Sequence, residues 1–351
     1  MMKGTAAGEL WRRIKKEFLA PVPVFTIVEL SIALMFIVAC IVDVSTDIFV
    51  AAEYFDKEMP LYGALTSIVI VISSFFVCAC GLYNYEMEYR NEGRLSQGGS
   101  VASRRTWICR IVFTVLQLGL VWRTVEYIAS GYKSRTADTD KERQWHQKAM
   151  LRKQRVIRVL GLADSFMESA PQLCLQLYVL IKLNPRKDVV GEVLRVVGLL
   201  SSWFSLAGAV VGWYKSRLED AGKEVGLKSQ IIYILWRLAE TGGRVLCIAY
   251  FASVFGLWVL LVLVVHWVVL LLWYLIFFKN GTNDGTLVFF GSSAIYTYSL
   301  MFCYLHHQEG PSRYRYIVFY IIFYLENFVM LVVASSATEG PWILVPHRHC
   351  G

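Results

Sequence analysis

The sequence predicts an all-α polytopic membrane protein with about eight transmembrane helices and one further re-entrant hydrophobic segment. Of its 351 residues, 56% are hydrophobic and only 18% are charged, whereas soluble domains carry about 25% charged residues. The mean hydropathy of +0.48 holds over the whole length, which indicates many lipid-facing segments and not a single anchor. Long apolar stretches recur from one end of the chain to the other, and a spanning helix needs about 20 such residues.

Nine apolar segments can be marked, with charged or polar loops between them. They are Val24–Val50, Leu61–Tyr85, Thr106–Ser130, Val159–Leu183, Val193–Tyr214, Ile231–Ser253, Leu257–Phe278, Thr286–Leu305 and Tyr316–Ala334. The stretch from Val245 to Phe278 contains no Asp, Glu, Lys or Arg. A single helix of that length would measure about 51 Å, too long for a hydrocarbon core of about 30 Å. We therefore divide it near Ser253–Gly256. A faint similarity between the two chain halves suggests two structurally related halves.

The positive charges of the loops set the predicted orientation, because cytoplasmic loops of membrane proteins are enriched in Lys and Arg. Residues 1–20 carry five of these charges and are predicted to lie in the cytoplasm, while the acidic loop 51–60 is predicted to lie outside. With an even number of spans, the short tail 335–351 returns to the cytoplasm. Residues 1–351 then form one membrane domain.

The third segment, Thr106–Ser130, conflicts with a simple crossing because basic residues flank it on both sides. The linker after it, 131–158, is the most basic in the chain. We therefore predict that the third segment is re-entrant, entering and leaving the membrane on the cytoplasmic side with a bend at Gly119. The alternative is nine plain spans with this basic linker outside. The linker itself is either a basic amphipathic surface helix or a solvated loop.

The orientation makes a prediction for the glycosylation sequon Asn280-Gly281-Thr282. The sequon follows the seventh segment and is therefore placed in the cytoplasm, away from the glycosylation machinery. We expect the protein made in eukaryotic cells to carry no N-linked glycan, so that glycosidase treatment leaves its electrophoretic mobility unchanged. A mobility shift that Asn280→Gln abolishes would contradict the orientation.

Many charged residues lie inside the apolar segments, where an ionised group costs at least about 2.5–3.5 kcal/mol at the bilayer centre. They are Glu29, Asp43 and Asp47 in the first segment, Arg123 and Glu126 in the third, Asp164 and Glu168 in the fourth, Arg237, Glu240 and Arg244 in the sixth, and Glu326 in the ninth. The summed cost is too large for positions that face lipid. These side chains are therefore predicted to point inward, to pair with one another or to meet water.

The spacing places several of these charges on common helix faces. Asp43 and Asp47 are four residues apart, and Glu29 lies 18 residues before Asp47, about five full turns. A continuous first helix would carry these carboxylates as one stripe about 27 Å long. The candidate counter-charges are Arg123, Arg237 and Arg244. Two interpretations stay open: structural ion pairs that fix helix packing, or a polar track for a lipid headgroup, an ion or a small solute.

A family resemblance is carried by the fourth segment, which contains Glu168-Ser169-Ala170-Pro171-Gln172-Leu173 followed by Gln176-Leu177-Tyr178. This stretch resembles the signature of the XK-related family. Four other pieces match that family in the same order: Asp43-Val44-Ser45-Thr46-Asp47, Leu116-Gln117-Leu118-Gly119 with Arg123 and Glu126, Arg244 with Phe251-Ala252-Ser253, and Phe323-Tyr324-Leu325-Glu326-Asn327. The resemblance thus extends over most of the chain.

The resemblance implies a multi-pass plasma-membrane scramblase that moves phospholipids between leaflets without ATP, including the exposure of phosphatidylserine in apoptosis. It also implies that intramembrane charges form the lipid path, and that the matching positions are Glu29, Asp43, Asp47, Arg123, Asp164, Glu168 and Arg244. Pro171 would kink the helix that carries two of them. The implied partners are phospholipids and a single-span membrane subunit or a second copy in a homodimer. The caspase activation of several members finds no support here, because residues 1–20 and 339–351 contain no Asp.

Other function classes find little support in the sequence. There is no Gly-rich phosphate loop, G-x-S-x-G turn or H-E-x-x-H pair, so we do not expect an enzyme. The net charge of +8 comes from the loops and not from a basic groove with interleaved aromatic residues, so no nucleic-acid partner is expected. No cofactor or metal is expected either, because His347, His349 and Cys350 lack a fourth ligand. A solute or ion transporter, or a structural subunit of a partner complex, stays the alternative to scrambling.

Overall fold

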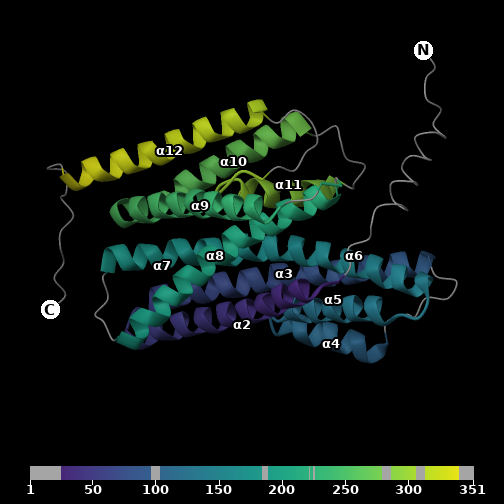
Figure 1. Cartoon of the computed structure of the whole chain (residues 1–351). Helices are drawn as coiled ribbons and strands as arrows, with labels where there is room; N and C mark the ends of the chain where they lie inside the picture. The colour runs from purple at the N-terminus through teal and green to yellow at the C-terminus, as the bar shows by residue number, and fades with distance from the viewer. Residues whose placement is uncertain are drawn as a thin grey trace, which may run out of the picture.

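The computed structural model describes residues 25–95, 103–183, 189–220, 222–223, 226–278, 286–305 and 313–339, and within these ranges all regular structure is helical (Figure 1). The helices are α2 (Ile27–Asp56), α3 (Pro60–Leu95), α4 (Arg104–Val115), α5 (Gly119–Thr136), α6 (Asp140–Asp164), the π-helical turn η1 (Ser165–Ser169), α7 (Ala170–Leu183), α8 (Val189–Asp220), α9 (Leu227–Phe255), α10 (Trp258–Phe278), α11 (Thr286–Ser299) and α12 (Arg313–Glu339). The predicted all-α fold is confirmed. The basic N-terminal residues 1–20, the sequon at Asn280 and the tail after Glu339 lie outside the described residues.

Six of the described helices are long and apolar enough to cross a membrane: α2, α3, α8, α9, α10 and α12. The predicted fourth span is also helical throughout, as the end of α6, the turn η1 and α7. The uncharged stretch divides where expected, since α9 ends at Phe255 and Gly256 adopts a positive φ of 60° before α10 begins. The chain is therefore a multi-pass membrane protein.

The third apolar segment is broken in its middle, as the re-entrant prediction requires. Helix α4 has only 12 residues, about 18 Å, which is too short to cross the hydrocarbon core. Its end is closed by the Leu118 N–H, which donates to the Phe113 carbonyl at 2.8 Å, while Gln117 takes a left-handed φ of 63°. Gly119, the predicted bend, is instead the first residue of α5, which packs back against α4.

The eighth apolar segment differs from the prediction of one continuous span from Thr286 to Leu305. Its helix, α11, has 14 residues, about 21 Å, and the chain from Leu300 to Leu305 is buried but not helical. The Glu240 carboxylate accepts from the Tyr304 backbone N–H at 3.3 Å, and Arg244 Nε donates to the Met301 carbonyl at 2.9 Å. Side chains of α9 thus supply hydrogen bonds that a helix would have made internally.

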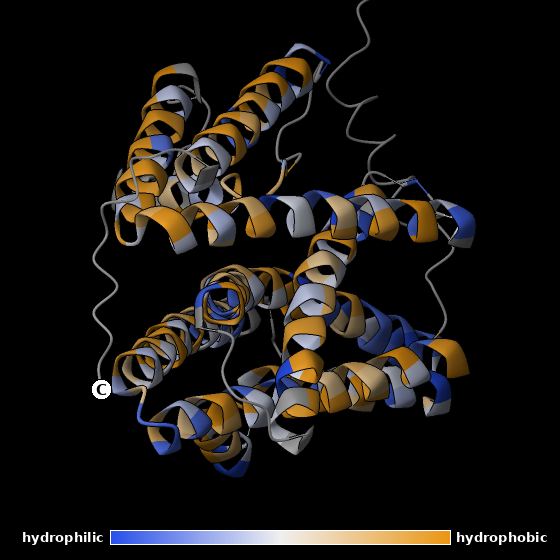
Figure 2. Cartoon of the chain, turned by 90° about the vertical axis from the view of Figure 1, so that its left-hand side faces the viewer, coloured by the Kyte–Doolittle hydropathy of each residue, from blue (hydrophilic) through white to orange (hydrophobic). Residues whose placement is uncertain are grey.

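The helices lie in layers whose centre holds the path from α6 to α8. Figure 1 shows α2, α3, α4 and α5 on one side, and α9, α10, α11 and α12 on the other. Helix α7 packs against both α8 and α9, while α8 packs against α2 and α9, so these two helices join the layers. Figure 2 shows apolar residues along most of the outer helices. The intramembrane charges named above are therefore sheltered by helices whose outer faces suit lipid.

The end of α2 offers a test of local backbone strain. Glu58 follows the helix with a left-handed φ of 58°, and its side chain is exposed. A side chain in this conformation costs about 1–2 kcal/mol relative to glycine. Replacing Glu58 with Gly should therefore raise the thermal unfolding temperature of the purified protein. Replacing Glu58 with Ala keeps the Cβ atom and should leave the temperature unchanged, so equal shifts in both variants would contradict this account.

The basic linker 131–158 is helical for most of its length. Residues up to Thr136 complete α5, and α6 begins at Asp140, capped by the Thr139 hydroxyl. The two helices pack side by side through Tyr127, Met150 and Ile157. The linker is therefore helical and not an irregular loop.

Candidate functional site

Three helical elements, α2, α6 and η1, bring four carboxyl groups together inside the membrane-spanning part. Asp43 and Asp47 lie on one face of α2, while Asp164 ends α6 and Glu168 lies in η1. Asp47 is 1% exposed and Glu168 is 8% exposed; the other two are half-buried. Asp47 interacts electrostatically with the other three. We call these four residues the carboxyl cluster.

Only weak polar neighbours surround the carboxyl cluster. The Ser73 hydroxyl of α3 donates to Glu168 at 2.8 Å, and the Ser201 hydroxyl of α8 donates to Asp43 at 3.4 Å. Neither side-chain oxygen of Asp47 meets a hydroxyl or N–H donor in the described residues, but its carboxyl group lies within hydrogen-bond reach of the Glu168 carboxyl group. Within the same residues, no Lys or Arg forms an ion pair with any of the four. Buried groups of this kind normally have a hydrogen-bond partner, which a proton shared between two carboxyl groups, water, an ion or a ligand can supply.

The turn η1 sets the position of Glu168. The Ala170 N–H donates to the Ser165 carbonyl, one residue further back than in an α-helix. Pro171 follows at once, has no N–H to donate, and its ring would crowd the carbonyl four residues earlier in a regular helix. The wide turn thus accommodates the proline, so the irregularity expected from Pro171 takes the form of a π turn that contains Glu168.

Further polar side chains without partners continue from the carboxyl cluster along α7. Gln172 and Gln176 follow Glu168 at intervals of four residues, are 0% and 4% exposed, and find no hydrogen-bond partner in the described residues. Thr66 of α3 and Ser202 of α8 are equally buried and equally unpartnered. These residues were not predicted from the sequence, because they carry no charge. The spacing of Glu168, Gln172 and Gln176 on one helix face was the available signal.

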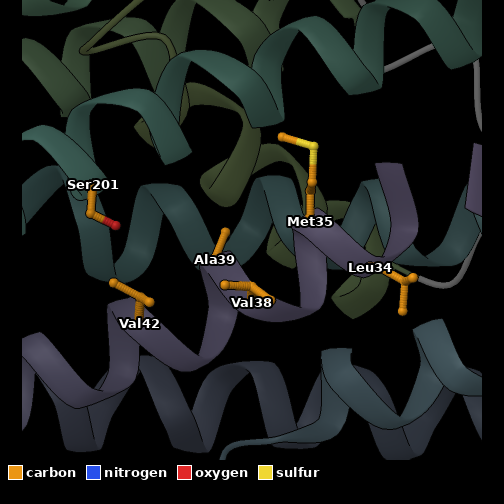
Figure 3. Close-up of a pocket in the computed structure, with 6 residues that line it drawn as sticks. All are labelled: Leu34, Met35, Val38, Ala39, Val42 and Ser201. Carbon is orange, nitrogen blue, oxygen red and sulfur yellow. The ribbon is translucent and has the colours of Figure 1, made fainter. Parts of the chain in front are cut away.

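An apolar hollow on the outside of α2 adjoins the carboxyl cluster. Its lining residues are Leu34, Met35, Val38, Ala39 and Val42 of α2 and Ser201 of α8, and its volume is about 430 Å³ (Figure 3). Ser201 belongs to both features, since its hydroxyl also donates to Asp43. The hollow therefore places a surface suited to an acyl chain next to groups suited to a lipid headgroup.

The structure does not bring Arg123 to the carboxyl cluster. Its guanidinium lies 3.4 Å from Glu88, donates to the Gly81 carbonyl at 2.8 Å, and covers the Tyr85 ring at 3.6 Å. Glu126, its expected neighbour three residues away, pairs instead with Arg110 at 2.8 Å. This network joins α3, α4 and α5 and fixes the broken third segment.

Arg237 and Arg244 also find partners away from the carboxyl cluster. Arg237 pairs with Glu240 at 2.5 Å, and Arg244 contacts Glu326 at 3.0 Å and the Asn327 side chain at 2.7 Å. Both arginines are fully buried. The expectation that Arg123, Arg237 and Arg244 are counter-charges to the carboxylates of the first segment is therefore wrong. Each arginine is neutralised within its own half of the molecule.

One member of this second network was missed from the sequence. His266 of α10 lies with Nδ1 2.8 Å from the Glu326 carboxylate, which also contacts Arg244. The network thus connects α9, α10 and α12. A single histidine in an otherwise apolar span gave no pattern from which this contact could be predicted.

Glu29 lies apart from the other two acidic residues of α2. It accepts from the Thr26 backbone N–H at 2.9 Å, while the Thr26 hydroxyl accepts from the Glu29 N–H, which together cap the start of the helix. The predicted stripe of three carboxylates therefore reaches the carboxyl cluster only through Asp43 and Asp47.

Comparison with known families agrees with the geometry. The family model described as XK-related protein matches residues 31–348. This range contains the whole carboxyl cluster, the apolar hollow, both arginine networks and the interrupted third and eighth segments. Because the match covers nearly the entire sequence, the chain belongs to the XK-related protein family.

Proposed function

We propose that this protein is a phospholipid scramblase that moves lipids between membrane leaflets without ATP. The observation that carries the proposal is a buried carboxyl cluster with no Lys or Arg ion-pair partner among the described residues, next to an apolar hollow on the outer face of α2. A lipid has the matching two-part chemistry, with a polar headgroup and apolar chains. Phosphatidylcholine, phosphatidylethanolamine and phosphatidylserine all carry a cationic nitrogen that a carboxylate can bind.

The physical basis is a lower cost of moving the headgroup through the hydrocarbon core. Transfer of a charged or strongly polar group out of water is unfavourable unless hydrogen bonds or opposite charges replace the lost water. Asp43 and Asp47 would contact the cationic nitrogen, while the amides of Gln172 and Gln176 can accept and donate hydrogen bonds. The acyl chains stay in hydrocarbon along the apolar face of α2. No chemical bond changes, so the process is transport and not enzymatic catalysis.

The proposal gives different roles to the predicted path residues. Asp43, Asp47, Asp164 and Glu168 would line the path, because their carboxyl groups keep unsatisfied bonding capacity. Arg123 and Arg244 are satisfied by protein partners and would hold helices together. Glu29 would act at the entrance of α2. We further propose a plasma-membrane location with cytoplasmic termini, phosphatidylserine as one substrate in apoptosis, and a single-span subunit or a second copy as partner.

Reconstitution in liposomes tests the proposal. Vesicles with a fluorescent phospholipid in both leaflets are treated with a membrane-impermeant quencher, and the fraction of signal lost is measured. Without scrambling about half of the label is protected, so a loss well beyond half without ATP is the expected result. Parallel vesicles loaded with a small fluorescent solute should retain it. Solute or ion flux with intact lipid asymmetry would favour a transporter, and no activity under any trigger would favour a structural subunit.

A further inference from the structure

An exposed stripe of four basic residues and one tryptophan runs along α6. Its members, Lys141, Trp145, Lys148, Arg152 and Arg155, recur every three or four residues and are all exposed. This spacing puts them on one face of the helix. The opposite face is buried, mainly through Met150 and Ile157, against α5. We call these five residues the basic stripe.

The charges of this helix are almost all positive. From Arg143 to Ala163 the chain contains six Lys or Arg residues and no Asp or Glu. His146 of the same helix has a pKa lowered first by burial and then by Lys133 of α5, against the opposing effect of Glu142. Such a surface attracts polyanions.

The position of the basic stripe selects a lipid over a soluble polyanion. One turn after Arg155 the same face continues with Val159, which is 52% exposed and begins the apolar span. The basic stripe and the exposed apolar surface at Val159 therefore lie on the same face of α6, one after the other.

The distance of each basic residue from Val159 along the helix indicates which lipid headgroups can reach it. With a rise of 1.5 Å per residue, Arg155, Arg152 and Lys148 lie about 6, 10 and 16 Å above Val159 for a helix near the membrane normal. The headgroup layer on each side is only about 5–7 Å thick. A serine or choline headgroup would reach Arg155 alone. A headgroup that projects from the layer with several phosphates can contact successive turns.

We propose that the basic stripe of α6 binds polyphosphorylated phosphoinositide headgroups in the leaflet that faces it. Guanidinium and ammonium groups on successive turns would hold the separate phosphates, and the exposed apolar surface at Val159 would lie beside the acyl chains. The proposal is independent of scrambling, because it concerns a surface outside the carboxyl cluster.

The experiment measures binding of a fluorescent short-chain phosphatidylinositol bisphosphate to the purified full-length protein in detergent. The test variant is Lys148→Gln/Arg152→Gln/Arg155→Gln. The matched control is Arg104→Gln/Arg105→Gln/Lys228→Gln, which removes the same charge at exposed positions of α4 and α9. At about fivefold in affinity per basic residue near an anionic lipid surface, the test variant should lose about 100-fold. The control should stay within about twofold, because none of its three residues belongs to the basic stripe.

Competition measurements distinguish a lipid headgroup from a free phosphorylated inositol, an acidic peptide and an RNA. The lipid probe should bind more tightly than free inositol trisphosphate, and an acidic peptide or an RNA oligonucleotide should not displace it. Equal affinity for the free headgroup, displacement by peptide or RNA, or equal loss in the control variant would each overturn the proposal. If the triple variant aggregates, Arg152→Gln alone should lose about fivefold, and unchanged affinity there would also overturn it.

Discussion

Replacing Asp43 and Asp47 together with Asn should slow lipid scrambling by tenfold or more, while leaving the amount of folded protein unchanged. A hydrogen bond to a charged group contributes about 1.5–3 kcal/mol, and about 1.4 kcal/mol corresponds to a factor of ten in rate. Loss of the carboxylates would remove this compensation from the headgroup during its passage. Initial rates in liposomes that contain equal amounts of wild-type and variant protein give the measurement.

Stability separates a role in the lipid path from a role in packing. Apart from the Glu168 carboxyl group, Asp47 has no hydrogen-bond partner among the described residues, and its charged neighbours in the carboxyl cluster are all acidic. An amide has nearly the shape of a carboxyl group and removes the repulsion between like charges. The thermal unfolding temperature of the double variant should therefore be equal to or higher than that of the wild type. A parallel fall in stability and rate would show that the pair is structural.

The matched control lies at the end of α2 and just beyond it. Asp56→Asn/Glu58→Gln removes the same charge at two exposed positions. It should keep the wild-type rate, because neither residue reaches the carboxyl cluster. Equal slowing in the control would attribute the effect to the overall charge of the protein instead of the intramembrane position.

Replacing Arg244 with Met should have the largest effect on folding. The arginine is fully buried and contacts Glu326, Asn327 and the Met301 carbonyl. Removing one partner of a buried charge pair costs about 3–5 kcal/mol, and the Glu326 carboxylate would keep only its contact with His266 among the described residues. The yield of monodisperse protein and its thermal unfolding temperature should both fall sharply.

Two comparisons make this prediction specific. Arg90 pairs with Glu86 at 2.5 Å, but both side chains are more than half exposed, and such surface pairs contribute only about 0–1 kcal/mol. Arg90→Met should therefore leave the yield and the thermal unfolding temperature nearly unchanged. Arg244→Met/Glu326→Gln should recover part of the lost stability, since the Glu326 carboxylate that has lost its arginine partner is also removed. An Arg244→Met protein as stable as the wild type would contradict the structural role given to this network.

The sequence predicted what depends on local chemistry. Segment length and apolar content identified the spanning helices, and the excessive length of 245–278 led to the division that Gly256 makes. The cost of charge in lipid predicted burial, and Asp47, Glu168, Arg237 and Arg244 are indeed buried. These inferences needed no knowledge of which helix lies next to which.

The choice of ion-pair partners could not be predicted, because it depends on contacts between distant helices. Arg123 pairs with Glu88, 35 residues away, and not with Glu126 three residues away. The hydroxyls of Ser73 and Ser201 lie in apolar stretches, where serine is common and gives no signal. The non-helical end of the eighth segment was equally hidden, since an apolar run reads the same whether or not it is helical.

The buried segment Leu300–Leu305 constrains the order in which the C-terminal half can assemble. Two of its backbone groups are satisfied by Glu240 and Arg244 of α9, and Arg244 is in turn held by Glu326 and Asn327 of α12. These partners come from both earlier and later in the chain. The segment can therefore reach its final conformation only after α12 has been synthesised and has docked on α9. In a ribosome-bound chain that stops before α12, the segment Leu300–Leu305 would lack its final hydrogen-bonded conformation. It would then be recognisable as unfolded.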